Sequence, residues 1–198
     1  MPRTAQQNQV LRDESQARIV ASALVVFART GYERASVRMI AQEAGVAQGL
    51  LYSYFESKEQ LLKGIFLQGL RGVQESFTLA DQGATPPERL ERLLRGSFAI
   101  LARDRPFWTL FYNLRWQPFV AEMLESDLRV WNELILTTLG DILRDLGVSD
   151  VETEATVLFA LIDGLGQQFV MQPDEFAIDV VIKTVMNRWT YQTLRNTQ

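Results

Sequence analysis

The segment from Ser36 to Lys58 constrains the fold of this chain more than any other part of the sequence. It reads as a short helix, a turn at Gly45, a second short helix and the beginning of a third. Gly45 supplies the backbone freedom that a tight turn between two helices needs. Apolar residues fall on the facing sides of the first two helices: Ile40, Ala41, Ala44, Val46, Leu50 and Leu51. This pattern predicts a helix-turn-helix, whose second helix enters the major groove of DNA with its N-terminal residues first.

The residue types that are missing exclude several kinds of chemistry. The chain has 198 residues and contains neither cysteine nor histidine. It therefore forms no disulfide, no thiolate metal site and no cysteine nucleophile, and it lacks the commonest zinc ligands and the commonest general base. The remaining polar residues form no recognisable catalytic set. We therefore predict no catalytic residue, no metal site and no cofactor.

The net charge of −4 is distributed unevenly along the chain. Residues 1–58 contain seven Lys and Arg against five Asp and Glu, which leaves 13 basic and 19 acidic residues in the remainder. The excess of positive charge therefore lies with the helix-turn-helix, where a phosphate backbone would be met. The acidic second part would be repelled by DNA and would help to orient the molecule.

Neither a secretion signal nor a membrane span is predicted. Residues 1–9 are polar and lack the apolar core of a signal peptide. A membrane-spanning helix needs ~20 apolar residues. The best candidate, residues 151–171, is interrupted by Asp163, Gly164, Gly166, Gln167 and Gln168. We therefore expect a cytoplasmic protein without membrane association.

Helical periodicity continues through nearly the whole chain and predicts an all-α fold of about nine helices. Candidate caps mark helix starts at Ser36, at Ser57 with Gln60, and at Ser149 with Glu152. Glycine and proline mark further boundaries at Gly31, Pro106, Pro118, Gly147 and Pro173. Besides the short helices of the motif, helices are predicted at about residues 15–30, 57–80, 88–103, 118–146, 149–171 and 174–194, with a loop at 81–87.

A set of spaced residues extends from the first predicted helix through the motif. The set consists of residues 26–32, Ile40, Ala41, Gly45, Val46, Gly49, Leu51, Tyr52, Tyr54, Phe55, residues 57–59, Leu61 and Leu62. This combination resembles the TetR-type transcriptional regulators over about residues 13–73. The resemblance implies a DNA-binding domain over 13–73, with the motif at about 36–55, and a helical ligand-binding and dimerisation domain over 74–198. It also implies a homodimer that binds a palindromic operator in double-stranded DNA and releases it on binding a small molecule.

The resemblance implies that residues of the motif contact DNA. They are Ser36, Val37, Arg38, Ala47, Gln48, Gly49, Leu50, Tyr52, Ser53, Tyr54 and Lys58. Arg38 and Lys58 would reach phosphates, the latter from a helix start. Gln48 would read a base edge, and Gly49 would let the backbone approach the groove.

Three features of the motif leave alternatives open. Ala47 occupies the N-cap of the second helix, where the family often has Ser or Thr. Alanine cannot cap, so the exposed N–H groups could instead meet a phosphate. Leu50 could contact a thymine methyl or pack inward. Gly45 could simply join two core helices, but a solvent-facing pair, Tyr52 and Tyr54, has little value in a core and suits phosphate contact.

The region between residues 98 and 131 is dense in aromatic side chains. Pockets are lined mainly by such residues together with a few polar groups. We therefore expect a small hydrophobic or aromatic effector there; the alternative is a bulky helical core with Arg115 as a surface charge. The candidate pocket residues are Phe98, Phe107, Trp108, Phe111, Tyr112, Asn113, Arg115, Trp116, Phe119, Met123, Trp131 and Asp163.

The last two long helices carry wide apolar faces. The family places a four-helix dimer interface here, with two helices from each subunit; the alternative is that the helices only close the core of one subunit. Glycines in the first of them cost helix propensity, which close helix–helix approach would offset. The candidate interface residues are Leu161, Gly164, Leu165, Gln168, Phe169, Val181, Val185 and Trp189.

These features together predict a ligand-controlled repressor. The helix that starts at Ser57 joins the two parts and could relay a change in the ligand-binding part to the DNA-reading part. An activator of the same family is an alternative that only the position of the operator would decide. A helical-bundle enzyme or ligand carrier is a further alternative, which DNA binding by the purified protein would exclude.

Overall fold

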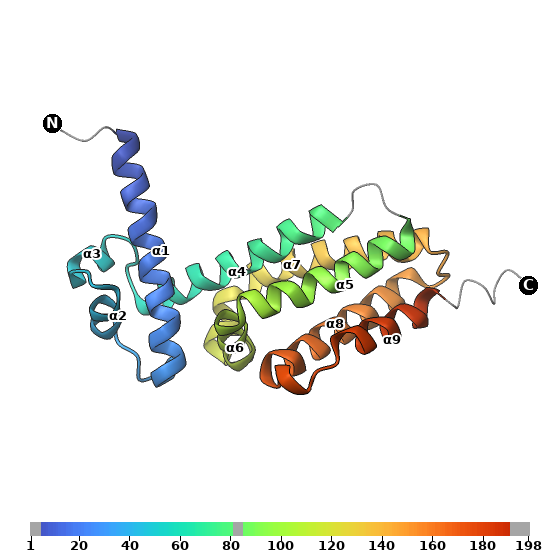
Figure 1. Cartoon of the computed structure of the whole chain (residues 1–198). Coiled ribbons are helices and arrows are strands. Elements are labelled where there is room, and N and C mark those ends of the chain that lie inside the picture. Colours follow the sequence, from blue (N-terminus) through green and yellow to red (C-terminus); the bar gives the residue numbers. More distant parts are fainter. Residues whose placement is uncertain (1–4, 81–84, 191–198) are drawn as a thin grey trace, which may run out of the picture. The chain divides into compact units, whose positions relative to one another are not determined.

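The computed structural model describes residues 5–80 and 85–190, which form nine α-helices, one short 3-10 helix and no strand (Figure 1). The all-α prediction is therefore confirmed. The helices are α1 (Ala5–Thr30), α2 (Val37–Ala44), α3 (Gln48–Tyr52), α4 (Lys58–Ala80), α5 (Pro86–Arg103), α6 (Arg105–Leu114), α7 (Pro118–Asp145), α8 (Val151–Met171) and α9 (Ile178–Thr190), with a 3-10 turn, η1, at Pro173–Glu175. Within the described ranges, no helix combines the length and the apolar character that a membrane crossing requires.

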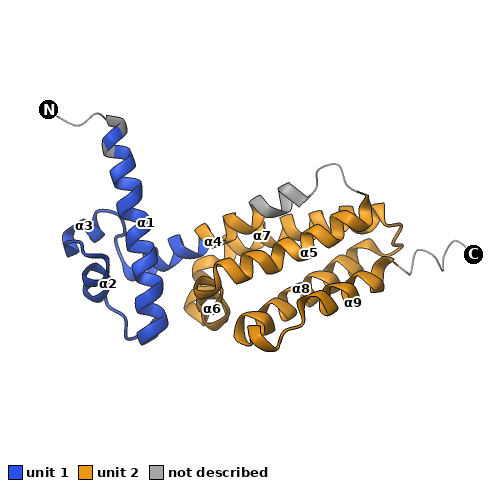
Figure 2. Ribbon diagram, viewed as in Figure 1, with its two compact units in different colours: residues 1–67 blue, residues 68–198 orange. Residues whose placement is uncertain are grey.

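The chain forms two compact units, residues 1–67 and residues 68–198 (Figure 2). The first unit contains α1, α2, α3 and the beginning of α4, and the second contains the rest of α4 and α5 to α9. The division lies within α4, as does the boundary at 73/74 expected from the sequence. One continuous helix therefore contributes to the cores of both units.

In the first unit, α2 packs on α1 and α3 packs on α2. An ion pair between Arg29 of α1 and Glu43 of α2, with 3.0 Å between nitrogen and oxygen, adds to the apolar contact. The buried side chains come from all four helices: Ile19, Ala23, Val26, Phe27, Ile40, Ala41, Leu51, Leu61, Leu62 and Ile65.

The Lys58 side chain fastens the connection between α1 and α2. Its ammonium group donates to the carbonyl oxygens of Tyr32 at 2.9 Å and Ala35 at 3.2 Å, and lies 3.4 Å from that of Glu33. It also lies 4.2 Å from the centre of the Tyr32 ring. Carbonyl groups that no helix or strand satisfies thus receive charge-assisted hydrogen bonds.

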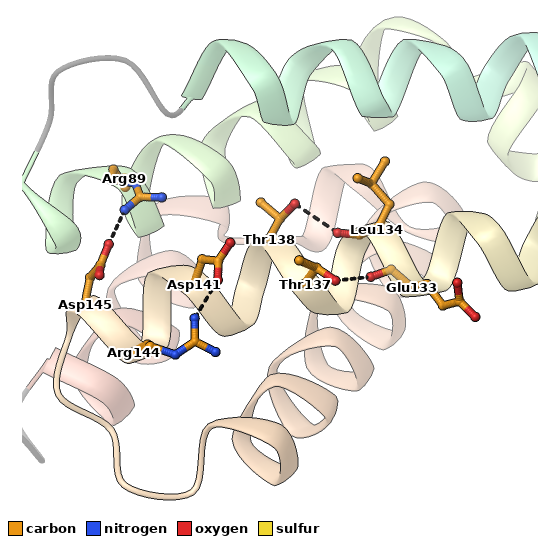
Figure 3. A network of polar contacts seen from close by, with 8 residues as sticks. All are labelled: Arg89, Glu133, Leu134, Thr137, Thr138, Asp141, Arg144 and Asp145. Atoms are coloured by element: carbon orange, nitrogen blue, oxygen red, sulfur yellow. Dashed lines mark hydrogen bonds and ion pairs between the residues drawn. The ribbon is translucent and has the colours of Figure 1, made fainter.

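The second unit is a helical bundle in which α8 packs against α5, α6 and α7, and α9 packs against α5. Figure 3 shows polar contacts near the end of α7: Arg89 of α5 pairs with Asp145, and Arg144 pairs with Asp141 of the same helix at 2.6 Å. Thr137 and Thr138 donate to carbonyls one turn earlier in the same helix.

Close packing at glycines brings helices of the second unit together. A Cβ atom at Gly69 of α4 would lie 2.0 Å from Cζ of Phe107 in α6, so the ring rests directly on the α4 backbone. A Cβ atom at Gly166 of α8 would lie 2.9 Å from Leu101 and 3.0 Å from the Tyr112 hydroxyl. The predicted close approach at Gly166 is confirmed, whereas a Cβ atom at Gly164 would meet no atom within 4 Å.

Several helix boundaries agree with the sequence-based expectations. Pro118 opens α7, Pro106 lies in the first turn of α6, and Gly147 has φ 77° after the end of α7. Ser57 accepts the amide hydrogen bond of Gln60 at 3.1 Å, although the Gln60 side chain reaches the amide of Glu56 rather than that of Ser57.

Other boundaries differ from the expectations. Helix α1 begins at Ala5 rather than near residue 15. The prediction missed its first part because the described side chains between 9 and 14 are all exposed and form no apolar stripe. Asp150, not Ser149, caps α8, since its carboxylate accepts from the amide of Thr153 at 3.3 Å. Residues 81–84 of the predicted loop and 191–194 of the last predicted helix lie outside the described residues, and α9 follows η1.

Replacing Lys58 by methionine is expected to lower the free energy of unfolding by about 2 kcal/mol, because backbone carbonyls lose charge-assisted hydrogen bonds while the aliphatic packing is kept. Chemical denaturation monitored by circular dichroism measures the change. The control is Arg38→Met, because Arg38 is exposed on α2. Equal stability of the two variants would contradict a fastening role for Lys58.

Replacing Gly69 by alanine is expected to destabilise the protein by about 1–3 kcal/mol, because the new methyl group would displace the Phe107 ring. The matched control is Gly96→Ala in α5, where a Cβ atom meets nothing within 4 Å. That variant should be neutral or more stable, since alanine favours the helix. Thermal unfolding gives the melting temperatures of the two variants. A Gly69→Ala protein that melts at the wild-type temperature would contradict the packing described.

Candidate nucleic-acid interface and ligand cavity

Gly45 makes the turn of the motif. Its φ of 65° is left-handed, a conformation that glycine adopts without steric cost. The amide of Gly45 donates to the carbonyl of Gln42 at 3.2 Å, and the amide of Val46 donates to that of Ala41 at 3.0 Å. This pair of bonds is a Schellman motif, which satisfies the last carbonyls of α2. The predicted turn is confirmed, and it directs the chain straight into α3.

Helix α3 has one buried side and one exposed side. Leu51 is wholly buried, and Phe55, just beyond the helix, is 6% exposed. Ala47, Gln48 and Gly49 are exposed, and Leu50 is 39% exposed. Leu50 is therefore far more exposed than Leu51, and the leading turn of α3 forms a small surface of mixed polar and apolar character.

The start of α3 lacks a side-chain cap, as expected from alanine at this position. Ala47 has extended backbone angles, φ −65° and ψ 141°, and makes no side-chain hydrogen bond. The first amide groups of a helix have no partner within it, so they remain available to an acceptor outside. A Cβ atom at Gly49 would meet nothing within 4 Å, so the fold itself does not require glycine there.

The residues after α3 differ in exposure. Tyr52 is 47% exposed, whereas Tyr54 is half-buried, with the Arg12 guanidinium 5.5 Å from its ring centre. The Ser53 hydroxyl donates to the Leu50 carbonyl at 2.7 Å and is exposed. The place of Arg12 beside the motif was not expected from the sequence, because it lies in the part of α1 without an apolar stripe.

The other predicted DNA contacts lie at helix starts. Ser36 caps α2, its hydroxyl accepting from the Met39 amide at 3.2 Å. Val37 is half-buried, and Arg38 is exposed. Lys58 is held by the α1–α2 connection, so its contact with phosphate stays a prediction. The DNA roles of the whole predicted set likewise remain predictions.

The second unit contains a small cavity of about 50 Å³ with almost entirely apolar walls. Its residues come from α4, α5, α6, α7 and α8. They are Val73, Ser97, Ile100, Leu101, Trp108, Tyr112, Trp131, Ile135, Phe159, Ile162 and Asp163. The cavity therefore lies where helices that are distant in the sequence meet.

Only some of the predicted pocket residues border this cavity: Trp108, Tyr112, Trp131 and Asp163. Phe98, Phe107 and Phe111 are buried in the surrounding core, and Phe119 and Met123 are partly buried outside the lining. Trp116 is 77% exposed and Asn113 is exposed, so the prediction that they line this cavity is wrong. Both lie at the end of α6 and face solvent. The lining residues that were missed are aliphatic or lie on other helices, and no local pattern distinguishes them from core.

Arg115 and Asp163 form the main polar feature beside the cavity. Two parallel hydrogen bonds, both 2.7 Å long, join the guanidinium of Arg115 to the carboxylate of Asp163. The guanidinium also lies 4.8 Å from the centres of the Tyr112 and Trp116 rings. Burial raises the pKa of the Tyr112 hydroxyl, and Asp163 raises it further, so this group stays uncharged far above neutral pH.

An apolar stripe on α8 and α9 is left partly uncovered within the single chain. Leu161, Gly164 and Leu165 are partly exposed on α8, and Gln168 is exposed. On α9, Val181 is partly exposed and the neighbouring Val180 is 65% exposed. These positions recur at helical spacing, as expected for a face that packs against other helices.

Three predicted interface residues need correction. Phe169 is 5% exposed, Val185 is 6% exposed and Trp189 is wholly buried within the single chain. The Trp189 indole N–H donates to Glu154 at 2.8 Å, so the ring packs between α9 and α8. These side chains belong to the core of the subunit, because each lies on the inner face of its helix.

The chain matches two family models in succession. Residues 19–65 match the family described as "Bacterial regulatory proteins, tetR family". Residues 86–190, more than half of the chain, match the family described as "BetI-type transcriptional repressor, C-terminal". The first match contains the helix-turn-helix, and the second contains four of the five helices that line the cavity.

Individual relatives agree with these matches. The fatty acid metabolism regulator protein of Bacillus subtilis (strain 168) is 25% identical over 85% of this chain and 90% of its own length. A TetR-like transcriptional regulator from Rhodococcus sp. RHA1 has a TM-score of 0.70 at 25% identity, covering 98% of both chains. The regulator FadR from Bacillus subtilis, solved in complex with stearoyl-CoA, is 24% identical and has the same fold, with a TM-score of 0.72 over 88% of this chain and 97% of its own. The chain belongs to the TetR family of bacterial transcriptional regulators.

Proposed function

We propose that this regulator is a homodimeric repressor that binds a palindromic operator through α3 and leaves it when an apolar small molecule enters the cavity of the second unit. The observation that carries the proposal is the exposed leading turn of α3. Gln48, Gly49 and Leu50 face solvent while Leu51 holds the helix to the core. A surface of this kind, next to a helix-turn-helix turn, suits a major groove.

The division of roles within this surface follows from the chemistry of each side chain. The Gln48 amide can donate and accept at once, which matches the N6 and N7 atoms of adenine. Gly49 adds no side chain and so permits close approach of the backbone. Arg38 and Tyr52, both exposed, would contact phosphates, which position the protein without reading sequence.

Two copies of the chain are needed to read a palindrome. The uncovered stripe of α8 and α9, which includes Gly164, supports a four-helix interface made from two helices of each subunit. The recognition helices of such a dimer would enter successive major grooves ~34 Å apart. Affinity would then fall steeply with salt, because phosphate contacts from both subunits release counterions.

The small size of the cavity supports an opposing effect of ligand on DNA binding. At about 50 Å³ it is smaller than the ~150 Å³ cavity that holds a benzene molecule in a protein core. A ligand of benzene size or larger would therefore displace some of the side chains or helices that line it. Helix α6 supplies Trp108 and Tyr112 to the cavity and presses Phe107 on Gly69 of α4. Because α4 continues into the first unit, a shift of α6 would also displace the part of α4 that belongs to the first unit.

The relatives suggest which ligands to test. The Bacillus subtilis relative is a fatty acid metabolism regulator, and the FadR structure contains stearoyl-CoA. These names favour a ligand with a long apolar part, which agrees with the apolar walls of the cavity. Thermodynamic linkage requires such a ligand and the operator to weaken each other's binding equally, typically by a coupling of ~1–3 kcal/mol.

Selection of bound sequences from a random DNA pool tests the DNA-binding proposal and should yield a palindrome with half-sites one helical turn apart. On the selected site, Gln48→Ala should reduce the binding free energy by ~1–3 kcal/mol and relax the base preference at one position of each half-site. Gly49→Ala should also weaken binding, by crowding the groove, while its melting temperature stays equal or rises.

The control is Gln68→Ala, because Gln68 is exposed on α4 outside the motif. Fluorescence anisotropy with labelled duplex measures the affinity of all three variants for the selected site. If Gln48→Ala and Gly49→Ala bind the selected site as tightly as the control does, α3 is not the reading helix.

Gly164→Glu is expected to convert the dimer into monomers. A Cβ atom at this position meets no atom within 4 Å in the same chain, so folding should be retained, whereas a charge would be buried in the proposed interface. Light scattering gives the mass in solution. The control, Ala102→Glu, places the same charge on the exposed side of α5. A dimer that survives Gly164→Glu would contradict this interface.

A further inference from the structure

The first half of α1 extends beyond the core of the first unit. The helix begins at Ala5, but Ile19 is the first buried residue among its described side chains, and Val10 and Leu11 are 52% and 40% exposed. Figure 1 shows the blue start of α1 continuing past α2 and α3. The match to the tetR family begins at residue 19, so it assigns no role to the residues before it. This half of the helix is therefore open to a partner outside the unit.

One face of α1 changes character where the core ends. Side chains seven residues apart lie almost above one another on an α-helix, because seven residues make nearly two turns. Arg12 is therefore on the same face as Ile19 and Val26, which are both 0% exposed. Gln16 belongs to this face as well, seven residues before the buried Ala23. The face that is buried in the core thus continues beyond it through two exposed polar side chains, Arg12 and Gln16.

The polar face of α1 lies beside the helix-turn-helix. The Arg12 guanidinium is 5.5 Å from the centre of the Tyr54 ring, and Tyr54 follows the end of α3 by two residues. Across residues 5–80 and 85–190, no carboxylate pairs with Arg12. Contact with the face of a ring takes up none of the N–H groups in conventional hydrogen bonds. The Arg12 guanidinium is therefore held next to the motif with its donors available.

The charged residues of this half of α1 are sorted by face. Residues three, four or seven positions from Arg12 share its face, and none of them is acidic. Asp13 and Glu14 follow Arg12 directly, so helical geometry turns them about 100° and 200° away from it. Arg18, by contrast, comes four residues after Glu14 and shares a face with it. The face that passes the motif is thus the one whose positive charge stands without an acidic neighbour.

From this arrangement, and resting on the proposed function, we infer that the first half of α1 is a second DNA-contacting element, in which Arg12, with Gln16 beside it, binds a backbone phosphate next to the groove that α3 enters. A guanidinium offers paired donors that match two phosphate oxygens. A DNA backbone suits this face better than a protein does, because its exposed described side chains are polar and its one charge is positive. Such a contact adds affinity and orients α3 without reading sequence.

The test compares Arg12→Gln with Arg18→Gln, because both changes remove one positive charge from an exposed position on the same half of α1. Fluorescence anisotropy with the full-length protein measures the affinity for the selected operator and for an unrelated duplex over a series of salt concentrations. Arg12→Gln is expected to weaken binding to both duplexes by about tenfold. It should also reduce the slope of log K against log salt concentration by ~2, for one phosphate contact from each subunit of a dimer.

Arg18→Gln should keep the affinity and the salt slope of the wild type, and Arg12→Lys should keep the slope because the charge remains. Equal effects of Arg12→Gln and Arg18→Gln would overturn the inference, since the loss would then reflect net charge alone. A lower melting temperature of Arg12→Gln with an unchanged salt slope would also overturn it, because Arg12 would then only support Tyr54. A change of mass in light scattering would show that this face contacts a second copy of the chain instead.

The Gln48→Ala variant separates this inference from the proposed function. The proposed function requires Gln48→Ala to weaken binding to the selected operator more than to the unrelated duplex, whereas this inference requires Arg12→Gln to weaken both equally. If Gln48→Ala behaves in that way and Arg12→Gln binds like the wild type, only this inference is wrong. If the wild type binds both duplexes equally well, operator recognition is wrong, and the salt slope still decides the role of Arg12. If the wild type binds neither duplex, both proposals are wrong.

Discussion

The display of α3 depends on the burial of its opposite side. A helix of five residues is far too short to be stable alone, because nucleation costs more than so few hydrogen bonds return. It persists here because Leu51 and Phe55 are buried and because the left-handed turn at Gly45 joins it directly to α2. Because one side of α3 is buried in the core, helical geometry leaves Gln48 and Gly49 on its exposed side. The surface that we propose reads DNA is thus a consequence of how the motif is held.

In the second unit, large side chains pack directly against the helix backbone at glycines. Phe107 rests on the backbone at Gly69, and Gly166 admits Leu101 and Tyr112. Interiors packed at this density have discrete arrangements rather than continuous deformations. A ligand that enlarges the cavity would therefore move whole helices and not only side chains. Since α4 contributes to both units, the same packing that stabilises the second unit would, in the proposed mechanism, also couple ligand binding to DNA binding.

The sequence predicted the elements whose signals are local. Gly45, Pro118 and Gly147 marked boundaries that the structure has, because backbone freedom and the missing amide of proline act at single positions. The start of α1 could not be predicted in this way, since its described side chains between 9 and 14 are all exposed and show no periodicity. The cap of α8 was misplaced by one residue, because neighbouring Ser149 and Asp150 are both good capping residues.

The sequence by itself determined the helical class, the helix-turn-helix and the family, because these depend on spacing along one helix or across one turn. Only the tertiary structure decided which aromatic residues reach the cavity, and that Trp116 faces solvent. It also decided that Trp189 belongs to the subunit core and that Arg12 lies beside Tyr54. An apolar side chain looks the same in a sequence whether it meets a core, a ligand or another subunit. The choice among these depends on which helices pack together, and that is a property of contacts between distant parts of the chain.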